Sequence, residues 1–453
     1  MNKKLLATAI VSCLYSIDTF GAGLDRTGQS VSAFLQSGNY GEIGFSTISP
    51  RVKGIDNSGN TLSNIGEIDS FPNAALKLQA TQKLSVGLLF DEPFGTKGIY
   101  SGDNNFTANG SSGIYGPTRA EVNSTNLTGL VGYEPLSNFK LYGGFAYQQI
   151  SGEANLRGPV YGVFNGYDVS FKKDGAYGWV SGLEYQIPEI GFKTSITYRS
   201  KIKHKLNTYE SIQINSLLSS TSSNIQELNN NLINIDNILT KISNIDDDNS
   251  QKNSLIKQRQ FIIENKSNLQ EQQALFNSLN LLVPSTKDSL SDLTTPQSLN
   301  IDFQIGIISN TVLFGNLRWV DWKNFSINPE MFSTLTKAIY PDMNGFALTD
   351  YQKDQWSTTF GIGRKVNDKL SGSISVGWDS GTGIPVGSLG PTDGYWNSGI
   401  GVRYTPTSQI ELSGGIKYYW LGDAKGTVAK RFIVSDFKDN NTLGMGFKFG
   451  YHF

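Results

Sequence analysis

The sequence is poor in the residues that build metal centres and many catalytic sites. Its 453 residues include 1 cysteine, Cys13, and 2 histidines, His204 and His452. Structural zinc sites need clusters of cysteine and histidine, and hydrolases of the Ser-His-Asp type need a histidine held beside the nucleophile. His204 heads a long polar segment and His452 is next to the last residue, so neither suggests a catalytic set. We therefore expect no metal, no cofactor and no enzymatic activity.

A surplus of charge of one sign is also missing. The chain has 38 Lys and Arg against 39 Asp and Glu, a net charge of −1. Proteins that bind nucleic acid need a basic surface to neutralise phosphates, so this class is excluded.

Long hydrophobic runs are absent as well. No uninterrupted apolar stretch reaches about 18 residues, so we expect no transmembrane helix. The mean hydropathy of −0.27 would suit a soluble protein. A transmembrane β-barrel looks equally polar, however, because its spans are alternating segments of about ten residues.

The first residues, MNKKLLATAIVSCLYSIDTFGAG, have the pattern of a secretory signal peptide. Two lysines precede an apolar run from Leu5 to Tyr15, and Gly21 and Ala22 supply small residues for cleavage. Cys13 lies inside this segment, so cleavage at 21 or 22 leaves a mature protein without a thiol or a disulfide. The run 10–13 loosely resembles a lipidation box, and that reading stays open.

From Tyr40 onward apolar and polar residues alternate with a period of two, which is typical of strands. In 370–379, for example, Ile374, Val376 and Trp378 share one face, while serines and Asp379 share the other. The chain is also rich in aromatic residues and glycine, with 25 Phe, 20 Tyr and 49 Gly. We count about fourteen such segments, the last spanning 431–453, and an even number suits a bacterial barrel.

The connections between these segments alternate between short and long. Short periplasmic turns and long outer loops are typical of outer-membrane barrels, and they place both termini on the periplasmic side. A soluble β-sandwich is the alternative fold, but it accounts for neither this alternation nor the signal peptide.

One long segment, 211–293, does not alternate. From Ile225 to Ile242 its apolar residues follow a spacing of three and four, and from Leu255 to Phe276 they recur every seven residues. We predict an antiparallel helical hairpin with arms of roughly 40 Å in an outer loop. A solvated stalk, a lid over a pore and a docking surface are all compatible with this pattern.

The chain ends with aromatic residues at alternate positions, among them Phe449, Tyr451 and Phe453. We predict that they face lipid while the last strand pairs with the first near Tyr40. A terminal aromatic residue on such a strand resembles the signal that the barrel assembly machinery reads, so we assign these three residues to assembly.

Several stretches match the sequence pattern of a known family. The most specific is RWVDW at 318–322. The others are AGLDRTGQ at 22–29, LLFDEPFG at 88–95, TTPQSLNIDFQIGI at 294–307, TVLFGNLRWVDWKNF at 311–325, LGPTDGY at 389–395 and YWLGDA at 419–424. Together they resemble the FadL/TodX (OmpP-like) family of outer-membrane transporters for long-chain fatty acids and other hydrophobic compounds. The resemblance covers the chain apart from 211–293.

The resemblance implies a fourteen-stranded barrel that is plugged by an N-terminal hatch and releases ligands sideways near a distorted third strand. That strand contains Asp91 and Pro93 here, and proline removes a ladder donor, so we place the gate at these residues. The alternative is that Pro93 only ends the membrane part of the strand. The hatch, 22–39, is shorter than in better-known relatives and lacks their Asn-Pro-Ala motif. We expect Val31, Phe34 and Leu35 to share one side of a short helix in it.

A fatty acid needs an apolar pocket and a cation for its carboxylate. We predict Phe34, Leu35, Leu89 and Phe314 as apolar lining. Arg318 and Arg403 are the preferred cations because a guanidinium binds a carboxylate with two hydrogen bonds. The other cations on lumenal positions are Lys77, Lys193, Arg199, Lys417 and Lys448. For all of these cations, the alternative is a wall charge paired with Glu184, Asp302 or Glu411.

The expected protein is an all-β transmembrane barrel of the bacterial outer membrane, most simply a monomer. Its expected function is passive uptake of long-chain fatty acids or similar hydrophobic compounds. The alternatives are a surface-interaction protein that uses the helical insert, with the barrel as anchor, and a general polar porin. The expected segments are a signal peptide at 1–21, a hatch at 22–39, strands one to seven at 40–210, the insert at 211–293 and strands eight to fourteen at 294–453.

Overall fold

The structure, a computed structural model, describes residues 24–242, 250–429 and 432–453. The predicted signal peptide, the first hatch residues and the acidic break in the helical insert lie outside these ranges. No helix in the described part of the chain is long and apolar enough to cross a membrane.

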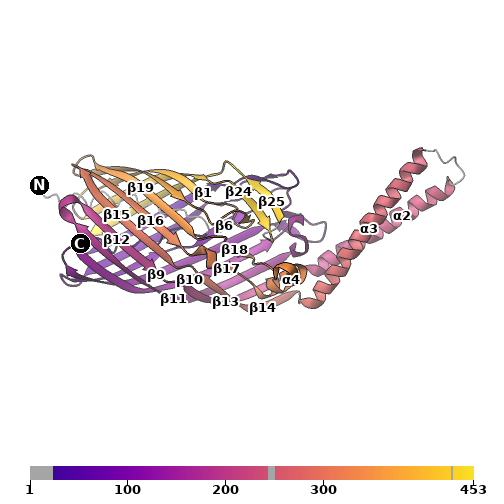
Figure 1. The fold of residues 1–453 in the computed structure, drawn as a ribbon, viewed down its shortest axis with the longest axis horizontal. Coiled ribbons are helices and arrows are strands. Elements are labelled where there is room, and N and C mark those ends of the chain that lie inside the picture. The colour runs from indigo at the N-terminus through magenta and orange to yellow at the C-terminus, as the bar shows by residue number, and fades with distance from the viewer. Residues whose placement is uncertain (1–23, 243–249, 430–431) are drawn as a thin grey trace.

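A single antiparallel sheet closes on itself, which confirms the predicted fourteen-stranded barrel (Figure 1). β1 pairs with both β4 and β26, so the sheet has no free edge. Three of the fourteen wall strands are in two pieces. In chain order the wall is formed by β1 (Tyr40–Arg51), β4 (Asp69–Gln79), β5 (Leu84–Asp91) with β6 (Gly95–Ile99), β9 (Arg119–Leu136), β10 (Phe139–Leu156), β11 (Tyr167–Ile187), β12 (Phe192–Arg199) with β13 (Ile202–Ser211), β14 (Thr286–Thr295) with β15 (Ser298–Ile308), β16 (Thr311–Val320), β19 (Gln355–Lys365), β20 (Leu370–Asp379), β22 (Tyr395–Tyr404), β23 (Ile410–Leu421) and β26 (Asn441–His452).

The faces of these strands follow the predicted alternation. Ile374 and Val376 are 62% and 57% exposed on the outside, whereas Ser373 and Ser375 are buried inside. Tryptophans lie side by side on the outer face: Trp319 pairs with Trp356, and Trp396 with both Trp378 and Trp420. An apolar outer band bordered by aromatic residues, around a polar interior, is the architecture of a bacterial outer-membrane barrel.

The C-terminal strand closes the barrel as predicted. β26 pairs with β1 from Asn441 to His452, and the side chains of Tyr451 and Phe453 remain exposed on the outer face. The predicted start of this strand at 431 is wrong. Residues Phe432–Phe437 form β25, which pairs with β24 and β2 in a separate outer sheet, and the wall strand begins only at Asn441.

The outer loops form small sheets and helices of their own. The separate sheet consists of β21 (Val386–Gly387), β24 (Ala424–Val428), β25 (Phe432–Phe437), β2 (Gly54–Asp56) and β3 (Thr61–Leu62). Two-stranded pairs are formed by β7 (Thr107–Asn109) with β8 (Tyr115–Pro117) and by β17 (Ser326–Ile327) with β18 (Thr349–Asp350). The short helices are α4 (Glu330–Ile339), η1 (Pro159–Phe164), η2 (Pro188–Ile190), η3 (Trp322–Asn324) and η4 (Pro341–Met343).

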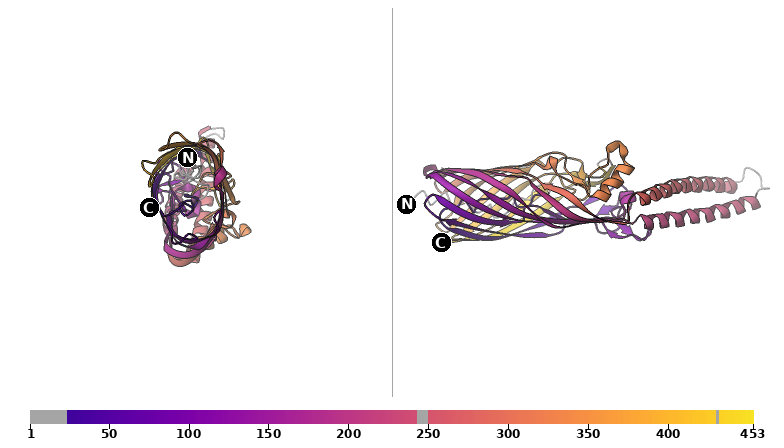
Figure 2. Two further views of the ribbon diagram at one scale, coloured as in Figure 1. Left: turned by 90° about the vertical axis from the view of Figure 1, so that its left-hand side faces the viewer. Right: turned by 90° about the horizontal axis from the view of Figure 1, so that it is seen from below.

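The predicted helical hairpin extends from the end of the barrel opposite to the C-terminus (Figures 1 and 2). Its arms are α2 (Ile214–Lys241) and α3 (Ser250–Leu282), of 28 and 33 residues. Arg259 of α3 pairs with Asp236 of α2 at 2.7 Å, which fixes the antiparallel alignment.

The insert is shorter than the predicted 211–293. β13 continues to Ser211, and Thr286–Thr295 form β14, which pairs with β13 in register. The seventh and eighth strands therefore continue outward to the base of the hairpin. Residues 286–293 were assigned to the helical insert because polar residues interrupt their apolar pattern.

The described part of the hatch, residues 24–39, lies inside the barrel and forms no helix. Phe34 N, Leu35 N and Gln36 N donate to the carbonyls of Val31, Ser32 and Ala33, so the segment forms consecutive turns. Ser30 Oγ also accepts the backbone N–H of Ser32, and such side-chain bonds compete with a helix. The predicted apolar side is nevertheless present, since Val31, Phe34 and Leu35 are all buried.

Candidate functional site

The third wall strand is interrupted where the sequence places proline. β5 ends at Asp91 and β6 begins at Gly95. Both β5 and β6 pair with β9 on one side. On the other side β4 pairs with β5 only from Ala74 to Gln79. Its outer part, Asp69–Asn73, pairs with β1 but with no residue of the third strand. The ladder between the second and third strands resumes only as one bridge, Gly66 with Gly98.

The N-terminal segment fills this break. Asp25 forms an antiparallel bridge with Phe94. Arg26 N donates to Pro93 O, and Gly95 N donates to Leu24 O, each at 2.8 Å. The third strand therefore exchanges its barrel neighbour for the N-terminal segment over these residues.

Arg26 spans the break with its side chain. Its guanidinium pairs with Asp69 on β4 and lies 4.0 Å from Glu92. It also lies over the ring of Phe71, 5.9 Å from the centroid. Gly95 makes room for this side chain, because a Cβ there would come within 2.0 Å of Arg26 Cζ. Arg26 thus fixes the N-terminal segment to both edges of the break.

The predicted gate residue Asp91 also binds this segment. Its carboxylate accepts a hydrogen bond from Thr27 Oγ1 at 2.7 Å and one from Asn126 Nδ2 at 2.9 Å. Asp91 and Pro93 therefore both contact the N-terminal segment.

Arg318, a preferred ligand cation, holds the hatch in this structure. Its Nε donates to Asp25 Oδ2 at 2.7 Å, and Nη1 donates to Gly28 O at 3.0 Å. Asn300 on the adjacent strand supports both partners, since it donates to Gly28 O and accepts from Arg318. The carboxylate of Asp25 thus occupies the place in which a ligand carboxylate was expected.

Arg403, the other preferred cation, is paired within the wall. It donates to Glu411 at 2.6 Å. Lys448 lies 3.2 Å from Glu42, and Lys193 lies 2.8 Å from Glu184. For Arg403 and Lys193 the structure has the wall pairing that was weighed as the alternative.

Arg199 has no such partner. It is only 5% exposed, and its guanidinium donates to Thr128 Oγ1 at 3.2 Å and to Gln29 O at 3.1 Å. Its Nε makes no hydrogen bond, and no carboxylate of the described residues forms an ion pair with it. Arg199 is predicted only as one of several lumenal cations, because the residues around it come from distant strands.

The predicted apolar residues Phe34, Leu35 and Leu89 come together below this polar layer. We call their group the lower apolar cluster; it consists of Val31, Phe34, Leu35, Leu89, Leu130, Tyr142, Ala146 and Val180. The ring of Phe34 packs edge-on against Tyr142 at 5.8 Å. Glycines at 87 and 132 leave room for it, because a Cβ at either would lie within 3.0 Å of the ring. Phe314 is buried but belongs to no such cluster.

A much larger group, the upper apolar cluster, fills the outer part of the lumen. It joins wall residues to the outer loops, and its aromatic members include Tyr100, Phe106, Phe164, Tyr167, Trp322 and Phe332. Burial in this cluster raises the pKa of the loop residue Tyr161 to about 12. Leu24 belongs to it, whereas Val31 and Phe34 belong to the lower cluster. The hatch therefore separates two apolar compartments with the polar layer around Asp25, Arg199 and Arg318.

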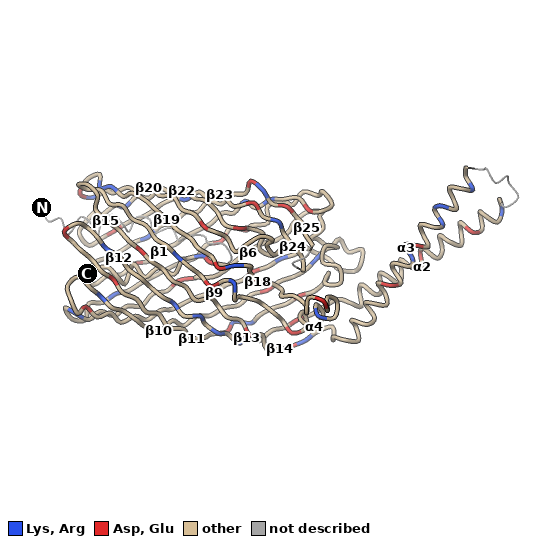
Figure 3. Tube along the Cα trace, viewed as in Figure 1, with Lys and Arg blue, Asp and Glu red and all other residues tan. Residues whose placement is uncertain are grey.

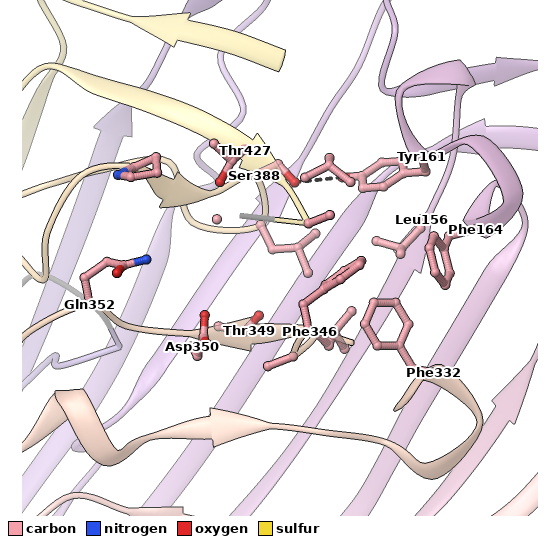
Figure 4. Close-up of a pocket in the computed structure, with 17 residues that line it drawn as sticks. Leu156, Tyr161, Phe164, Phe332, Phe346, Thr349, Asp350, Gln352, Ser388 and Thr427 are labelled. Atoms are coloured by element: carbon pink, nitrogen blue, oxygen red, sulfur yellow. Dashed lines mark hydrogen bonds between the residues drawn. The ribbon is translucent and has the colours of Figure 1, made fainter. Parts of the chain in front are cut away.

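Two cavities open within the upper cluster. One, of about 70 Å³, is lined by wall residues such as Ile150 and Leu206, by loop residues such as Phe325, and by Leu24 and Thr96 beside the break. The other, of about 60 Å³, is lined largely by residues of the outer loops (Figure 4). Phe164, Phe332 and Phe346 gather on one side of it, and Tyr161 and Ser388 lie 3.1 Å apart, Oη to Oγ, on another. These loop residues are not among those predicted from the sequence, although the aromatic residues in 322–351 are a possible signal for them.

No cluster of three or more His, Cys, Asp or Glu side chains suited to a metal occurs among the described residues.

In comparisons with known proteins, the chain matches solved structures only. No protein-family model matches the sequence, and no curated protein matches it. Among solved structures, a FadL homologue of Pseudomonas aeruginosa is similar over 98% of this chain and 99% of its own, with a TM-score of 0.62 and 12% identity. The toluene transporter TodX of Pseudomonas putida is similar over 97% of each chain, with a TM-score of 0.57 and 10% identity. The chain shares the fold of these two proteins.

Proposed function

We propose that this protein takes up hydrophobic molecules passively across the outer membrane and releases them sideways through the break in the third strand. The ligands are long-chain fatty acids or compounds of similar character. The fold shared with a FadL homologue and a toluene transporter supports this function, as do the apolar compartments inside the barrel. A monomeric barrel inserted by the assembly machinery is part of the same proposal.

One observation carries the proposal: the break is closed by the N-terminal segment rather than by the wall. A continuous ladder could open only by breaking many backbone hydrogen bonds between two wall strands. Here, withdrawal of residues 24–26 removes two backbone hydrogen bonds, the Arg26 contacts with Asp69 and Glu92, and the ion pair of Asp25 with Arg318. The cavity of about 70 Å³ reaches Leu24 and Thr96, so a ligand in it lies beside this closure.

Arg199 supports a carboxylate among the ligands. A buried guanidinium without an ion pair is unfavourable, and here the one described carboxylate whose charge acts on it, that of Asp91, lies beyond ion-pair distance. An anion that enters beside Arg199 gains a charge-assisted hydrogen bond. Arg199 also binds Gln29 O of the hatch, so a ligand that takes over its donors would loosen the hatch. Entry of ligand and opening of the break would then be coupled.

The test is uptake in cells that lack the gene, with and without a plasmid that carries it. We expect the plasmid to restore uptake of labelled oleate, and uptake of labelled toluene to show whether a carboxylate is required. Equal uptake of both compounds with and without the protein would refute the transport function. If cells that lack the gene take up less of a polar solute of similar size but the same amount of oleate, the porin function is favoured instead.

A surface-interaction function of the hairpin has one observation in its favour. Ile233 and Phe261 are 58% and 64% exposed on the arms, and Leu281 is 90% exposed near the base. A contact surface on the hairpin would use exposed apolar side chains such as these, provided that they form a contiguous patch with a partner bound. This candidate is separable from transport, because the hairpin projects beyond the barrel (Figure 1).

A further inference from the structure

The outer face of the sixth and seventh wall strands carries an unusual concentration of lysine. We call this group the basic seam; it consists of Lys172 and Lys173 on β11, Lys201 at the start of β13, and Lys203 and Lys205 on β13, all exposed. Figure 3 shows the blue segments of β11 and β13 close together on one side of the wall. Within the described residues, none of these ammonium groups forms an ion pair or a hydrogen bond.

Two irregularities of the backbone create this surface. The register of β10 with β11 shifts between Ile150 and Gly152, a bulge that leaves both Lys172 and Lys173 exposed. The ladder of β11 is also interrupted, since its pairs with β12 stop at Val180 and its pairs with β13 resume only at Phe171. The lysines flank this interruption on both strands.

The interruption is held by side chains. Asp174 accepts a hydrogen bond from Lys205 N at 3.3 Å and lies 3.2 Å from Nδ1 of His204. Asp174 is thus directed at the backbone and at His204, and Asp292 lies opposite Lys205 on β14. Asp288 on β14 and Glu153 on β10 are also exposed beside the seam, and Glu153 lies 3.6 Å from Arg119. Four carboxylates, two of which are held by other groups, stand against five lysines, so the seam keeps a surplus of positive charge.

The position of the seam relative to the membrane follows from the aromatic residues beside it. Tyr177 and Trp179 are 75% and 48% exposed on the same face of β11, and Trp179 packs against Tyr198 at 5.1 Å. Exposed aromatic residues on a barrel mark the boundary of the hydrocarbon layer. β11 runs to the turn η2 at the end of the barrel that carries the C-terminus, so the lysines lie on the outer side of Trp179.

The lysines follow the aromatic residues at the depth of lipid head groups. Lys201 is next to Ser200, which bonds to Trp179 O, and Lys173 is further along β11. At about 3.3 Å per residue, the seam covers roughly the first 20 Å of strand beyond Trp179. By contrast, β20 ends at Asp379 directly after Trp378, so the wall there stops at its aromatic residues.

From this arrangement we propose that the basic seam binds the phosphate groups of an anionic glycolipid of the outer leaflet. Its acyl chains lie against Tyr177 and Trp179, and its phosphates lie between the lysines of the two strands. Lysine is a flexible point charge that suits phosphate, and a wall surrounded by lipid is reached first by lipid. The proposal rests on the outer-membrane orientation given above, but not on transport.

The experiment uses the full-length protein purified in detergent and diphosphoryl lipid A, with native mass spectrometry as the readout. One variant replaces Lys172, Lys173, Lys201, Lys203 and Lys205 by glutamine. The matched control replaces the exposed outer lysines Lys53, Lys257, Lys337, Lys353 and Lys425 by glutamine. We expect the seam variant to bind lipid A at least about tenfold more weakly, and the control to bind like the wild type. A variant with arginine at all seam positions should retain binding, which separates loss of charge from misfolding.

Two further probes identify the source of the phosphate. Dephosphorylated lipid A should bind weakly, and inorganic phosphate at the same concentration should not displace diphosphoryl lipid A. Equal binding of lipid A by the wild type and the seam variant would overturn the proposal. Full displacement by inorganic phosphate, or equal binding of the dephosphorylated lipid, would do the same. Oleate uptake by the seam variant, measured in cells, reports separately on the proposed transport.

Discussion

The two sides of the barrel wall differ in how their strands are joined. From β16 to β26 the ladders between neighbouring wall strands run without a break in register. From β4 to β15 the third, seventh and eighth strands are divided, β10 is bulged against β11, and β11 loses its ladder over several residues. The regular side completes its ladders within the wall. On the irregular side, an interior segment or a side chain completes the hydrogen bonds that the wall lacks.

This difference indicates which side of the barrel can change its conformation during function. A regular ladder satisfies its own backbone groups, so it serves as a rigid support. A break leaves groups that another segment must satisfy, and a segment that binds can also leave. The predictions below test whether function is confined to the irregular side.

The largest effect is expected from fixing the N-terminal segment to the third strand. Asp25→Cys with Phe94→Cys places two cysteines at an antiparallel bridge, a separation that suits a disulfide. The only natural cysteine, Cys13, lies in the predicted signal peptide. We expect the oxidised protein to lose oleate uptake and a reductant to restore it. The control is a cysteine pair at Val376 and Ser398 on the regular side, which should transport in both states. Uptake of oleate by the oxidised variant with cysteines at 25 and 94 would show that release takes another route.

A smaller effect is expected from removing the unpaired guanidinium. Arg199→Gln should weaken oleate binding by about tenfold to a hundredfold, since hydrogen bonds to charged groups contribute about 1.5–3 kcal/mol. Binding of toluene, which has no carboxylate, should not change. The matched variant on the regular side is Arg403→Gln, whose guanidinium is already paired with Glu411. Isothermal titration of both ligands would decide, and a larger loss in Arg403→Gln would transfer the ligand site to the regular side.

Deletion of Phe453 tests the regular side directly. Its side chain is 52% exposed on the outer face at the closing strand, so we expect several-fold less protein in the outer membrane but unchanged oleate affinity of the protein that assembles. Quantitative immunoblots of membrane fractions measure the first, and titration measures the second. Phe447→Ala, an exposed aromatic residue on the same strand, is the control and should assemble normally. Normal assembly without Phe453 would remove its assignment as an assembly signal.

The smallest effect on uptake is expected from shortening the hairpin. The base of α2 and α3 must stay, because Leu217 and Phe276 pack in the upper apolar cluster. Ser222 and Gln273 face each other across the hairpin at 2.7 Å, so a short Gly-Ser loop between them can replace 223–272. We expect unchanged oleate uptake, and loss of any binding of the cells to a surface. Loss of uptake would instead make the distal hairpin a lid.

Much of the fold could be predicted because it depends on short-range patterns. The period of two in 370–379 fixed which side chains face lipid, and the spacing of three and four identified the hairpin. The predicted strand boundaries were less accurate where the residue pattern does not show whether a strand belongs to the wall. Residues Phe432–Phe437 form a strand, but in the outer sheet, and Thr286–Thr295 form a wall strand despite their polar residues.

The site was predicted only in part. Pro93 indicated the break in the third strand, since a proline cannot donate to a ladder. Phe34 and Leu35 were indicated as buried residues of the hatch. The sequence could not show which lumenal arginine lacks an ion pair, because Arg318, Arg199 and Arg403 look alike along the sequence.

The sequence alone thus determined the barrel, the direction of its strands, the outer hairpin and the position of the break. These features follow from residue patterns within single segments. Only the tertiary structure decided which arginine is paired, which segment closes the break and how the outer loops fill the lumen. Arg318 and Asp25 are 293 residues apart in the chain. Their contact exists only because the closed barrel brings the ninth strand to face the hatch, and no local pattern encodes that distance.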